Sequence, residues 1–530
     1  MSDNSIKIVL PELGRTIDAD RGDNLLERIR EGGIMMDADC GGVGRCGKCR
    51  VSIDGKVRLA CLTHVVEDIE VLIPSEKSDE GYSILTAYEG SDVRGVAEYE
   101  DGGTRGGIQS TTRGIAGSSS PLPDEGSSGY AIAIDIGTTT VVGKLIDLAN
   151  GLEVASFARL NAQRPYGADV ISRIEASLDD PSELSLLITS QIDREIASLL
   201  ATHGIKRSDV RKLVIAGNTT MSYILLGFPC RSLGSAPFRP AYPISDPYPY
   251  RDIFHTDTLA CACDVLPFIS AYVGGDLTAG LCSLRGENDF ILMDMGTNGE
   301  LLFKRGDRLI GTATAAGPAF EGGNIECGSG STRGAISSVH YEDRAFIYKT
   351  IGAAPATSIC GSGILDLMAI LVSEGLVDAT GRFSDDVEGD RIVLSQGFES
   401  TGIVGAAPVF FTQKDVRQFQ LAKSAVRAGL EVLQEEMGGD TPSRVFLAGG
   451  FGQNLNPASA CACGLLPATF RDRVIAVGNS SLSGAVKICL NDSARAETVK
   501  QIAKAQEINL ASHRLFSDLF MEHMTFEVPE

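Results

Sequence analysis

Residues 130–140 read Tyr-Ala-Ile-Ala-Ile-Asp-Ile-Gly-Thr-Thr-Thr, and residues 290–300 repeat this plan as Phe-Ile-Leu-Met-Asp-Met-Gly-Thr-Asn-Gly-Glu. Each stretch is a continuous apolar run, typical of a buried strand, that ends in Asp and a Gly-Thr turn. Three further segments recur in the same order: 213–218 with 446–450, 261–267 with 461–467, and 271–275 with 476–479. Four matched segments predict a duplicated α/β region whose two homologous lobes face one another.

The two Asp-Gly-Thr turns indicate a nucleotide site. A carboxylate at the carboxyl end of a buried strand can hold Mg²⁺ through water, and the turn beside it offers N–H and hydroxyl donors to phosphate. A P-loop is excluded, because the run from Gly137 to Lys144 has the wrong spacing and no Ser or Thr follows the Lys. The predicted acids are Asp135 and Asp294, and the predicted phosphate-binding residues are Gly137, Thr138, Thr139, Thr140, Gly296, Thr297, Asn298 and Gly299.

This pattern resembles the actin, sugar-kinase and heat-shock-ATPase superfamily, whose fold is ribonuclease H-like. The two Asp-Gly-Thr motifs are similar to its phosphate motifs, and residues 447–452, Leu-Ala-Gly-Gly-Phe-Gly, are similar to its adenosine motif. The resemblance implies ATP as the ligand. It also implies that adenosine contacts Gly449, Gly450 and Gly452.

Two further residues have a role implied by the same resemblance and an alternative that stays open. Asp276, ahead of a connecting helix, would orient the attacking water as a third catalytic acid, or would act as a helix N-cap before Thr278. Lys423 would reach adenosine, or would lie on a solvated face of its helix. That helix is predicted over 416–433, after a capping-box-like start at Thr412.

Four cysteines near the N-terminus predict a metal centre. Cys40, Cys46, Cys49 and Cys61 have the spacing C-x5-C-x2-C-x11-C, one residue longer than the plant-type 2Fe-2S pattern. Glycines between the first three let the backbone fold tightly around an inorganic core. Zinc is the competing metal, but zinc ribbons usually bring two separate C-x2-C knuckles. We therefore predict a 2Fe-2S cluster.

The sequence around these cysteines predicts a small α+β fold. A strand is expected at 6–9, a helix from Asn24 through Arg30, and a hairpin from strands at 48–53 and 57–59. Together these elements resemble the β-grasp ferredoxin fold over about residues 4–80. A domain of this kind would act as a one-electron carrier whose cluster lies close to the molecular surface.

The stretch from Gly90 to Gly129 has the composition of a linker, with 10 Gly and 7 Ser in 40 residues. As a flexible coil it would have an end-to-end distance of roughly 35 Å, long enough to let the ferredoxin module move between docking sites. The predicted domains are 1–85 (ferredoxin type), 86–129 (linker), 130–288 (ATPase lobe 1) and 289–530 (ATPase lobe 2).

Composition and charge exclude several classes of function. The chain has 530 residues, 43% of them hydrophobic and 22% charged, as in an ordinary globular protein. A net charge of -22 disfavours nucleic acid and anionic membrane as partners. Neither an export signal nor an apolar run long enough to span a bilayer is evident, so we expect a cytoplasmic protein with reduced thiols.

Two C-x-C pairs raise the question of a second metal site. Cys261 with Cys263 and Cys461 with Cys463 are each followed by a Leu-Pro sequence. Because the duplication would place one pair on each lobe, we predict packing in the core rather than a shared metal. Isolated cysteines elsewhere are expected to be small buried apolar residues.

The order of domains resembles the reductive activators of corrinoid enzymes. Residues 317–323, Gly-Pro-Ala-Phe-Glu-Gly-Gly, and residues 360–366, Cys-Gly-Ser-Gly-Ile-Leu-Asp, are also similar to loops of that family. The resemblance implies ATP-dependent transfer of one electron from the cluster to an inactive Co(II) corrinoid, which regenerates Co(I) for methyl transfer. Its implied partners are the corrinoid protein of a methyltransferase system and an upstream low-potential electron donor, and a homodimer is left open.

The chain departs from that family's pattern in two ways. Some relatives insert a further domain between ferredoxin and ATPase, for which this linker has no room, and others carry C-terminal cysteine clusters instead of the N-terminal module. The alternatives are an activator of another low-potential enzyme such as a 2-hydroxyacyl-CoA dehydratase, a non-catalytic redox or nucleotide sensor, and a small-molecule kinase.

Overall fold

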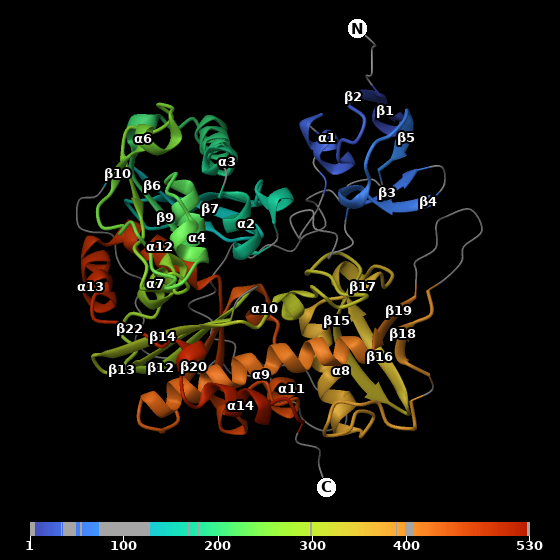
Figure 1. Ribbon diagram of the computed structural model, residues 1–530. Helices are drawn as coiled ribbons and strands as arrows, with labels where there is room; N and C mark the ends of the chain where they lie inside the picture. Colours follow the sequence, from blue (N-terminus) through green and yellow to red (C-terminus); the bar gives the residue numbers. More distant parts are fainter. Residues whose placement is uncertain are drawn as a thin grey trace, which may run out of the picture.

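The computed structural model describes residues 6–32, 34, 36, 49–53, 56–73, 128–167, 169–178, 180–296, 299–387, 389–397 and 408–526. Figure 1 shows a small N-terminal sheet, in blue, beside two larger α/β lobes. The predicted linker lies outside the described residues, apart from its last two positions. No helix within the described ranges combines the length and the apolar character needed to cross a membrane.

The N-terminal domain is a five-stranded mixed sheet with one helix packed on it. Its elements are β1 (Ile6–Leu10), β2 (Arg15–Ala19), α1 (Leu25–Glu31), β3 (Arg50–Ile53), β4 (Lys56–Leu59) and β5 (Ile69–Leu72), in the sheet order β2-β1-β5-β3-β4. Buried Leu25 and Ile29 of α1 pack in one core with Ile8 and Val71 of the sheet. The predicted strand, the helix capped by Asn24 and the β3–β4 hairpin are confirmed.

Lobe 1 is built on a six-stranded sheet with the order β10-β11-β9-β6-β7-β8. Its strands are β6 (Tyr130–Ile136), β7 (Thr140–Asp147), β8 (Glu153–Leu160), β9 (Val210–Gly217), β10 (Tyr248–Pro249) and β11 (Ala262–Val265). Its helices are α2 (Val170–Ala176), α3 (Pro181–His203), α4 (Thr219–Leu225), α5 (Arg231–Gly234), α6 (Tyr250–Phe254) and α7 (Gly275–Ser283).

Lobe 2 has a second six-stranded sheet, in the order β21-β20-β12-β13-β14-β22. Its strands are β12 (Asp289–Met295), β13 (Gly299–Arg305), β14 (Arg308–Thr314), β20 (Arg444–Ala448), β21 (Val474–Gly478) and β22 (Gln506–Glu507). Between β14 and β20 lie β15 (Ala335–Glu342), β16 (Ala345–Thr350), β17 (Ser358–Ile359), α8 (Gly361–Ser373), β18 (Arg391–Ser395), β19 (Val409–Thr412) and α9 (Gln413–Glu436). Helices α10 (Gly449–Gln453), α11 (Pro457–Ala462), α12 (Ser480–Leu490), α13 (Asp492–Ile502) and α14 (Phe516–Glu522) complete it.

The two sheets confirm the predicted duplication. In each, the first strand (β6 or β12) pairs antiparallel with the next strand and parallel with the fourth (β9 or β20). One of the matched segments is wrong, however. Cys263 lies on strand β11, whereas its counterpart Cys463 is the C-cap of helix α11, and the strand that occupies the position of β11 in lobe 2 is β21. Similar short sequences therefore occupy different structural positions.

One helix of lobe 2, α12, crosses to the sheet of lobe 1. Leu482 and Ala485 of α12 pack against Ala131 and Val142 of the lobe 1 sheet, although α12 follows the lobe 2 strands in the chain. Helix α7 packs between the two sheets, with Leu277 and Leu281 in the lobe 2 core and Ala279 and Cys282 in the lobe 1 core. The two helices cross at small residues, because a Cβ added to Gly484 would lie 1.8 Å from the carbonyl oxygen of Ala279. In Figure 1, α12 accordingly lies beside β6 and β9.

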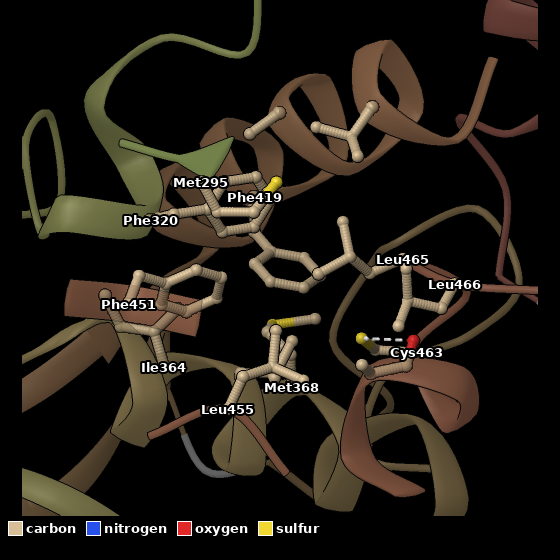
Figure 2. Close-up of a cluster of buried hydrophobic side chains, with 14 of the residues drawn as sticks. Met295, Phe320, Ile364, Met368, Phe419, Phe451, Leu455, Cys463, Leu465 and Leu466 are labelled. Carbon is tan, nitrogen blue, oxygen red and sulfur yellow. Dashed lines mark hydrogen bonds between the residues drawn. The ribbon is translucent and has the colours of Figure 1, made fainter. Parts of the chain in front are cut away.

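An aromatic cluster in lobe 2 fixes the loop that was predicted to bind adenosine. Phe451, from α10, stacks on Phe320 with ring centroids 5.1 Å apart, and Phe419 of α9 meets Phe320 edge-on (Figure 2). Gly361 lies so close that an added Cβ would be 1.8 Å from the Phe320 carbonyl oxygen. The two loops that carried the family resemblance therefore pack against one another and support α10.

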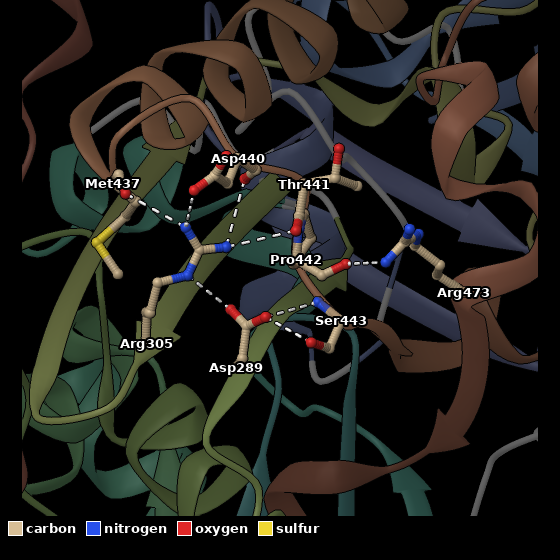
Figure 3. Close-up of polar contacts among 8 residues, drawn as sticks. All are labelled: Asp289, Arg305, Met437, Asp440, Thr441, Pro442, Ser443 and Arg473. Carbon is tan, nitrogen blue, oxygen red and sulfur yellow. Dashed lines mark hydrogen bonds and ion pairs between the residues drawn. The ribbon is translucent and has the colours of Figure 1, made fainter.

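An ion-pair network closes the far end of the lobe 2 sheet (Figure 3). Asp289 Oδ1 accepts a hydrogen bond from Arg305 Nε at 2.8 Å, and Asp289 Oδ2 accepts from the backbone and hydroxyl of Ser443. Arg305 also donates to backbone carbonyls of the turn after α9. Partial desolvation raises the pKa of Asp289, but these donors outweigh it and hold that pKa below its ordinary value.

We expect Asp289→Asn to lower the free energy of unfolding by about 1 kcal/mol at pH 7, since charge-assisted hydrogen bonds are lost. Because the pKa of Asp289 is lower in the folded state than in the unfolded state, its ionised form stabilises the fold above the unfolded pKa of about 3.9. This stabilisation is lost as the pH falls through the folded pKa. The difference between variant and wild type should therefore shrink on acidification from pH 5 to pH 3. Urea midpoints at each pH measure it, and a constant difference would contradict the assignment.

Candidate functional site

Three carboxylates converge between the lobes. Asp135 and Asp294 lie near the carboxyl ends of the equivalent strands β6 and β12, as predicted, and Asp276 lies in the first turn of α7. Each keeps partial solvent access. Asp294 feels the charges of both Asp276 and Asp135, so the structure brings the three predicted catalytic acids into one site.

Asp135 is held by neutral donors from the start of α12. Asn479 Nδ2 donates to Asp135 Oδ2 at 2.8 Å, and Ser481 Oγ donates to Asp135 Oδ1 at 2.7 Å. Asn479 is also the N-cap of α12, because its Oδ1 accepts from the backbone of Leu482. Burial raises the pKa of Asp135, although the two donors oppose that shift. Sequence reasoning matched the segment that ends at Asn479 but assigned the residue no role.

Asp276 and Asp294 form the acidic half of the site. Desolvation, followed by repulsion from Asp135, raises the pKa of Asp276 to about 7. Desolvation, followed by repulsion from Asp276, raises the pKa of Asp294 to about 8. The N-cap of α7 is Gly274, not Asp276, which is the second residue of the helix and accepts from Leu277 N at 2.8 Å. The alternative of an N-cap role for Asp276 is therefore wrong.

This set of side chains suits a hard divalent cation. The charges that act on Asp276 and Asp294, within the described part of the chain, come from one another, from Asp135 and from Glu321, and no lysine or arginine is among them. Oxygen ligands of this kind are those that Mg²⁺ prefers, and a bound cation would remove the mutual repulsion. Within the described residues these acids do not form a group that could ligate one ion directly, so they fit the predicted arrangement in which Mg²⁺ is held through water.

The lobe 1 phosphate turn is built from residues 137–140. Gly137 N donates to the Thr140 carbonyl at 2.8 Å, which closes the turn, and the Asn218 amide donates to Thr138 Oγ1 at 3.2 Å. Asn161 Nδ2 donates to the carbonyl oxygen of Gly137 at 2.9 Å. The structure thus brings the predicted residues Gly137, Thr138, Thr139 and Thr140 to the edge of the site.

A buried arginine behind this turn was not predicted. Arg173 is fully buried and donates to the carbonyl oxygens of Thr138 and Gly167 and to Gln163 Oε1. Desolvation lowers its pKa to about 9. No motif marks Arg173 in the sequence, where it reads as an ordinary polar residue of an amphipathic helix.

The lobe 2 turn and the adenosine motif lie against each other. Gly296 follows β12 and Gly299 begins β13, whereas Thr297 and Asn298 lie outside the described residues. Gly449 has φ +82°, and a Cβ there would lie 2.8 Å from Asp294 Oδ1. Gly450 has open space at its Cβ position. These positions give a ligand close access to the backbone beside Asp294, and Gly452 lies in the same short helix, α10.

Lys423 occupies a different place from the one expected. Its helix α9 begins with the predicted capping box of Thr412 and Asp415. However, Lys423 is only 1% exposed, and its Nζ donates to the carbonyl oxygens of His523 at 2.6 Å and Thr525 at 2.7 Å. Lys423 therefore does not lie on a solvated helix face, and its amine is bonded within the protein. We therefore replace the adenosine contact with a structural role, in which Lys423 holds the C-terminal segment.

The cysteine site is described in part. Cys49 and Cys61 are buried, and their sulfur atoms lie 3.2 Å apart. The Asn24 amide donates to the carbonyl oxygen of Cys61 at 2.9 Å, which ties Cys61 to the start of α1. Cys40 and Cys46 lie outside the described residues. Two adjacent thiols fit a cluster that is held by thiolates.

The C-x-C pairs belong to separate cores. Cys263 packs in the lobe 1 core and Cys463 in the lobe 2 core, and burial raises the pKa of both thiols. No group of three or more potential metal-ligating side chains is found within the described ranges. The prediction that these cysteines pack in the two cores is confirmed.

Comparisons with known proteins cover most of the chain. Residues 288–529 match the family described as the C-terminal domain of RACo, the ASKHA domain, residues 130–286 match the RACo middle region, and residues 9–71 match the 2Fe-2S iron-sulfur cluster binding domain. The corrinoid activation enzyme RamQ of Eubacterium limosum is 28% identical, over 98% of this chain and 99% of the relative. The Co(II) methylated amine-specific corrinoid protein reductase of Methanosarcina barkeri is 24% identical, over 75% and 77%.

A solved structure agrees with these relatives. It is described as a reductive activator for corrinoid, iron-sulfur protein, and it superposes with a TM-score of 0.66 at 27% identity, covering 98% of each chain. The similarity includes both the N-terminal sheet and the two lobes. The described part of this chain therefore has the fold of that structure.

Proposed function

Because the chain belongs to the reductive activators of corrinoid proteins, we propose that it uses ATP to pass one electron from a 2Fe-2S cluster to an inactive Co(II) corrinoid. The reduced cluster is oxidised by one electron, and Co(II) is reduced to the Co(I) state that methyl transfer requires. The partner is the corrinoid protein of a methyltransferase system. One observation carries the proposal: a cysteine domain and a two-lobed site of three carboxylates occur in one chain that aligns with corrinoid activators over almost its full length.

Finer points belong to the same proposal. We propose Mg²⁺ as the cation at the three carboxylates, an upstream low-potential donor that reduces the cluster again, and a cytoplasmic location. The ligand chemistry of the site supports the first point, and the one-electron balance requires the second. We also propose that the ferredoxin domain, the linker and ATPase lobe 1 end at residues 85, 129 and 288.

ATP is needed because the electron transfer is uphill. A plant-type cluster lies near roughly -400 mV, and for one electron each ~59 mV against the transfer lowers the product ratio about tenfold. An acceptor of more negative potential would stay mostly oxidised unless another reaction were coupled to the transfer. Hydrolysis in the two-lobed site supplies that reaction.

The residues of the site have distinct tasks in this reaction. When bound, Mg²⁺ neutralises phosphate charge and the cluster supplies a single electron. The turn at Gly137–Thr140 presents backbone and hydroxyl donors to phosphate, and Gly449 leaves room for the nucleoside. Asp276 is suited to orient the attacking water, because phosphoryl transfer depends mostly on positioning and charge stabilisation.

Electron paramagnetic resonance of cobalt tests the proposal. The cluster-loaded, reduced protein is incubated anaerobically with a Co(II) corrinoid protein, with or without Mg-ATP. We expect the Co(II) signal to disappear only with Mg-ATP, and Asp276→Asn to lower the rate of its loss at least about 100-fold. An equal Co(I) yield without ATP would refute the coupling.

A further inference from the structure

Helix α1 connects the cysteine site to lobe 1. At its start, Asn24 donates to the carbonyl oxygen of Cys61. In its last turn, Arg30 donates to the carbonyl oxygen of Pro165, which lies 135 residues along the chain in lobe 1. The Arg30 guanidinium carbon also lies 5.7 Å from the centroid of the Tyr166 ring, a cation–π distance. One short helix therefore reaches from a cluster ligand to the nucleotide-binding half.

Arg30 is a charged residue that lies next to both the cysteine site and lobe 1. Its positive charge is felt by Cys49 and Cys61 as well as by Tyr166. Its Nε is buried and has no hydrogen-bond partner among the residues that the structure describes. A cation in this position stabilises the more negative, reduced form of a cluster, and it loses that influence if the two domains separate.

The loop that receives Arg30 is also bonded to the phosphate turn. Asn161, at the start of this loop, donates to the carbonyl oxygen of Gly137. Behind it, Arg173 donates to the carbonyl oxygens of both Gly167 and Thr138. A change in the backbone of the turn on phosphate binding must therefore move the loop or break one of these bonds.

We propose that Arg30 docks the ferredoxin domain on the loop 161–167 of lobe 1, and that Asn161 and Arg173 couple this contact to the phosphate turn, so that binding of Mg-ATP releases the cluster domain. This inference rests on the proposed function and adds its regulation. Arg30 acts as a positioning residue, because it touches neither phosphate nor corrinoid. Release requires that Mg-ATP bind more tightly to the undocked state.

The absence of Trp from the chain allows a direct test. Tyr166→Trp keeps an aromatic face for Arg30 and introduces a single fluorophore, whose emission the docked cluster quenches by energy transfer. In the cluster-loaded full chain, we expect Arg30→Ala to raise this emission at least about twofold. Mg-ATP should raise it to a similar level when Arg30 is present and should add little when Arg30 is replaced.

Arg28→Ala is the matched control. Arg28 lies on the same helix but forms ion pairs with Asp23 and Glu31 inside the ferredoxin domain, so its loss should leave the emission unchanged. Emission that is equal with and without Arg30 would overturn the docking contact. Emission that responds to Arg30→Ala but not to Mg-ATP would overturn the coupling.

A second measurement keeps Tyr166 in place. In the otherwise unaltered holoprotein, Arg30→Ala should lower the ratio of reduced to oxidised cluster at a fixed electrode potential by about threefold or more, whereas Arg30→Lys should restore most of it. An unchanged ratio would overturn the placement of the charge beside the cluster. Failure of the proposed function is distinguishable, because it appears as ATP-independent Co(I) formation and not in emission or potential.

Discussion

Asp294→Asn is expected to lower the rate of ATP hydrolysis at least about 100-fold and, at the same time, to make the nucleotide-free protein more stable at pH 8. The loss of activity follows from removing an anionic oxygen from the proposed cation site. The gain in stability follows because burial, and then repulsion from two neighbouring acids, disfavours the charged form of Asp294. A variant that lost activity only because it unfolded would show the opposite change in stability.

The direction of the pH dependence follows from the raised pKa of Asp294, about 8 in the folded protein. An unfolded Asp titrates near 3.9, so between these two values the folded state binds more protons than the unfolded state. The stability that this group contributes is full below about pH 4 and is lost as the pH rises toward 8. We therefore expect little difference between variant and wild type near pH 4, and a gain of about 1–3 kcal/mol for the variant at pH 8.

Asp289→Asn is the matched control, since Asp289 begins the same strand whose end carries Asp294. Its carboxylate is stabilised in the folded state, so this variant should lose stability at neutral pH and keep its ATPase activity. Urea unfolding and phosphate release, measured from pH 4 to pH 8, separate the two effects. Loss of stability in Asp294→Asn at pH 8 would contradict the repulsion that we assign to the three acids.

Cys61→Ser is expected to abolish ATP-dependent Co(I) formation while ATP hydrolysis continues at close to the wild-type rate. Cys61 is buried with its sulfur 3.2 Å from that of Cys49, in a domain that has its own core. A hydroxyl is a poor ligand for this cluster, so bound iron should fall well below two atoms per chain. Iron analysis, visible absorbance and phosphate release measure the three expectations.

Cys461→Ser provides the control for this experiment. Cys461 is half-buried and packs against the lobe 2 core, and its thiol donates to the carbonyl oxygen of Pro467. A Ser hydroxyl can form the same hydrogen bond, so iron content and Co(I) yield should both stay at the wild-type level. Loss of iron in this variant would show that the C-x-C cysteines hold metal after all.

Much of the fold could be predicted because its signals are local. The apolar runs that end in Asp135 and Asp294 define the two central strands, and each run carries its turn with it. The helix start at Asn24 and the capping box at Thr412 are likewise contained within a few residues. Spacing and the intervening glycines predicted the N-terminal cysteine site, and the duplication predicted that the C-x-C pairs pack in separate cores, where Cys263 and Cys463 lie.

The remaining parts of the site depend on contacts between distant segments. Asn479 and Ser481 reach Asp135 across about 345 residues, since α12 crosses to the sheet of the other lobe. Arg173 reaches Thr138 from a helix whose sequence has no unusual feature. Lys423 was misplaced for the same reason: the carbonyl groups that bind it come from a segment 100 residues away. Helix and strand propensities and the spacing of residues in a motif contain no information on contacts between segments so far apart in the chain.

The crossing of α12 makes the surroundings of the first acid depend on a late segment of the chain. Asp135 accepts hydrogen bonds from Asn479 and Ser481 at the start of α12, whereas Asp276 begins a helix that packs on both lobes. Desolvation and mutual repulsion both disfavour the charged forms of Asp276 and Asp294. Nucleotide phosphates would add further negative charge beside these acids, so we expect nucleotide to bind poorly unless a divalent cation accompanies it.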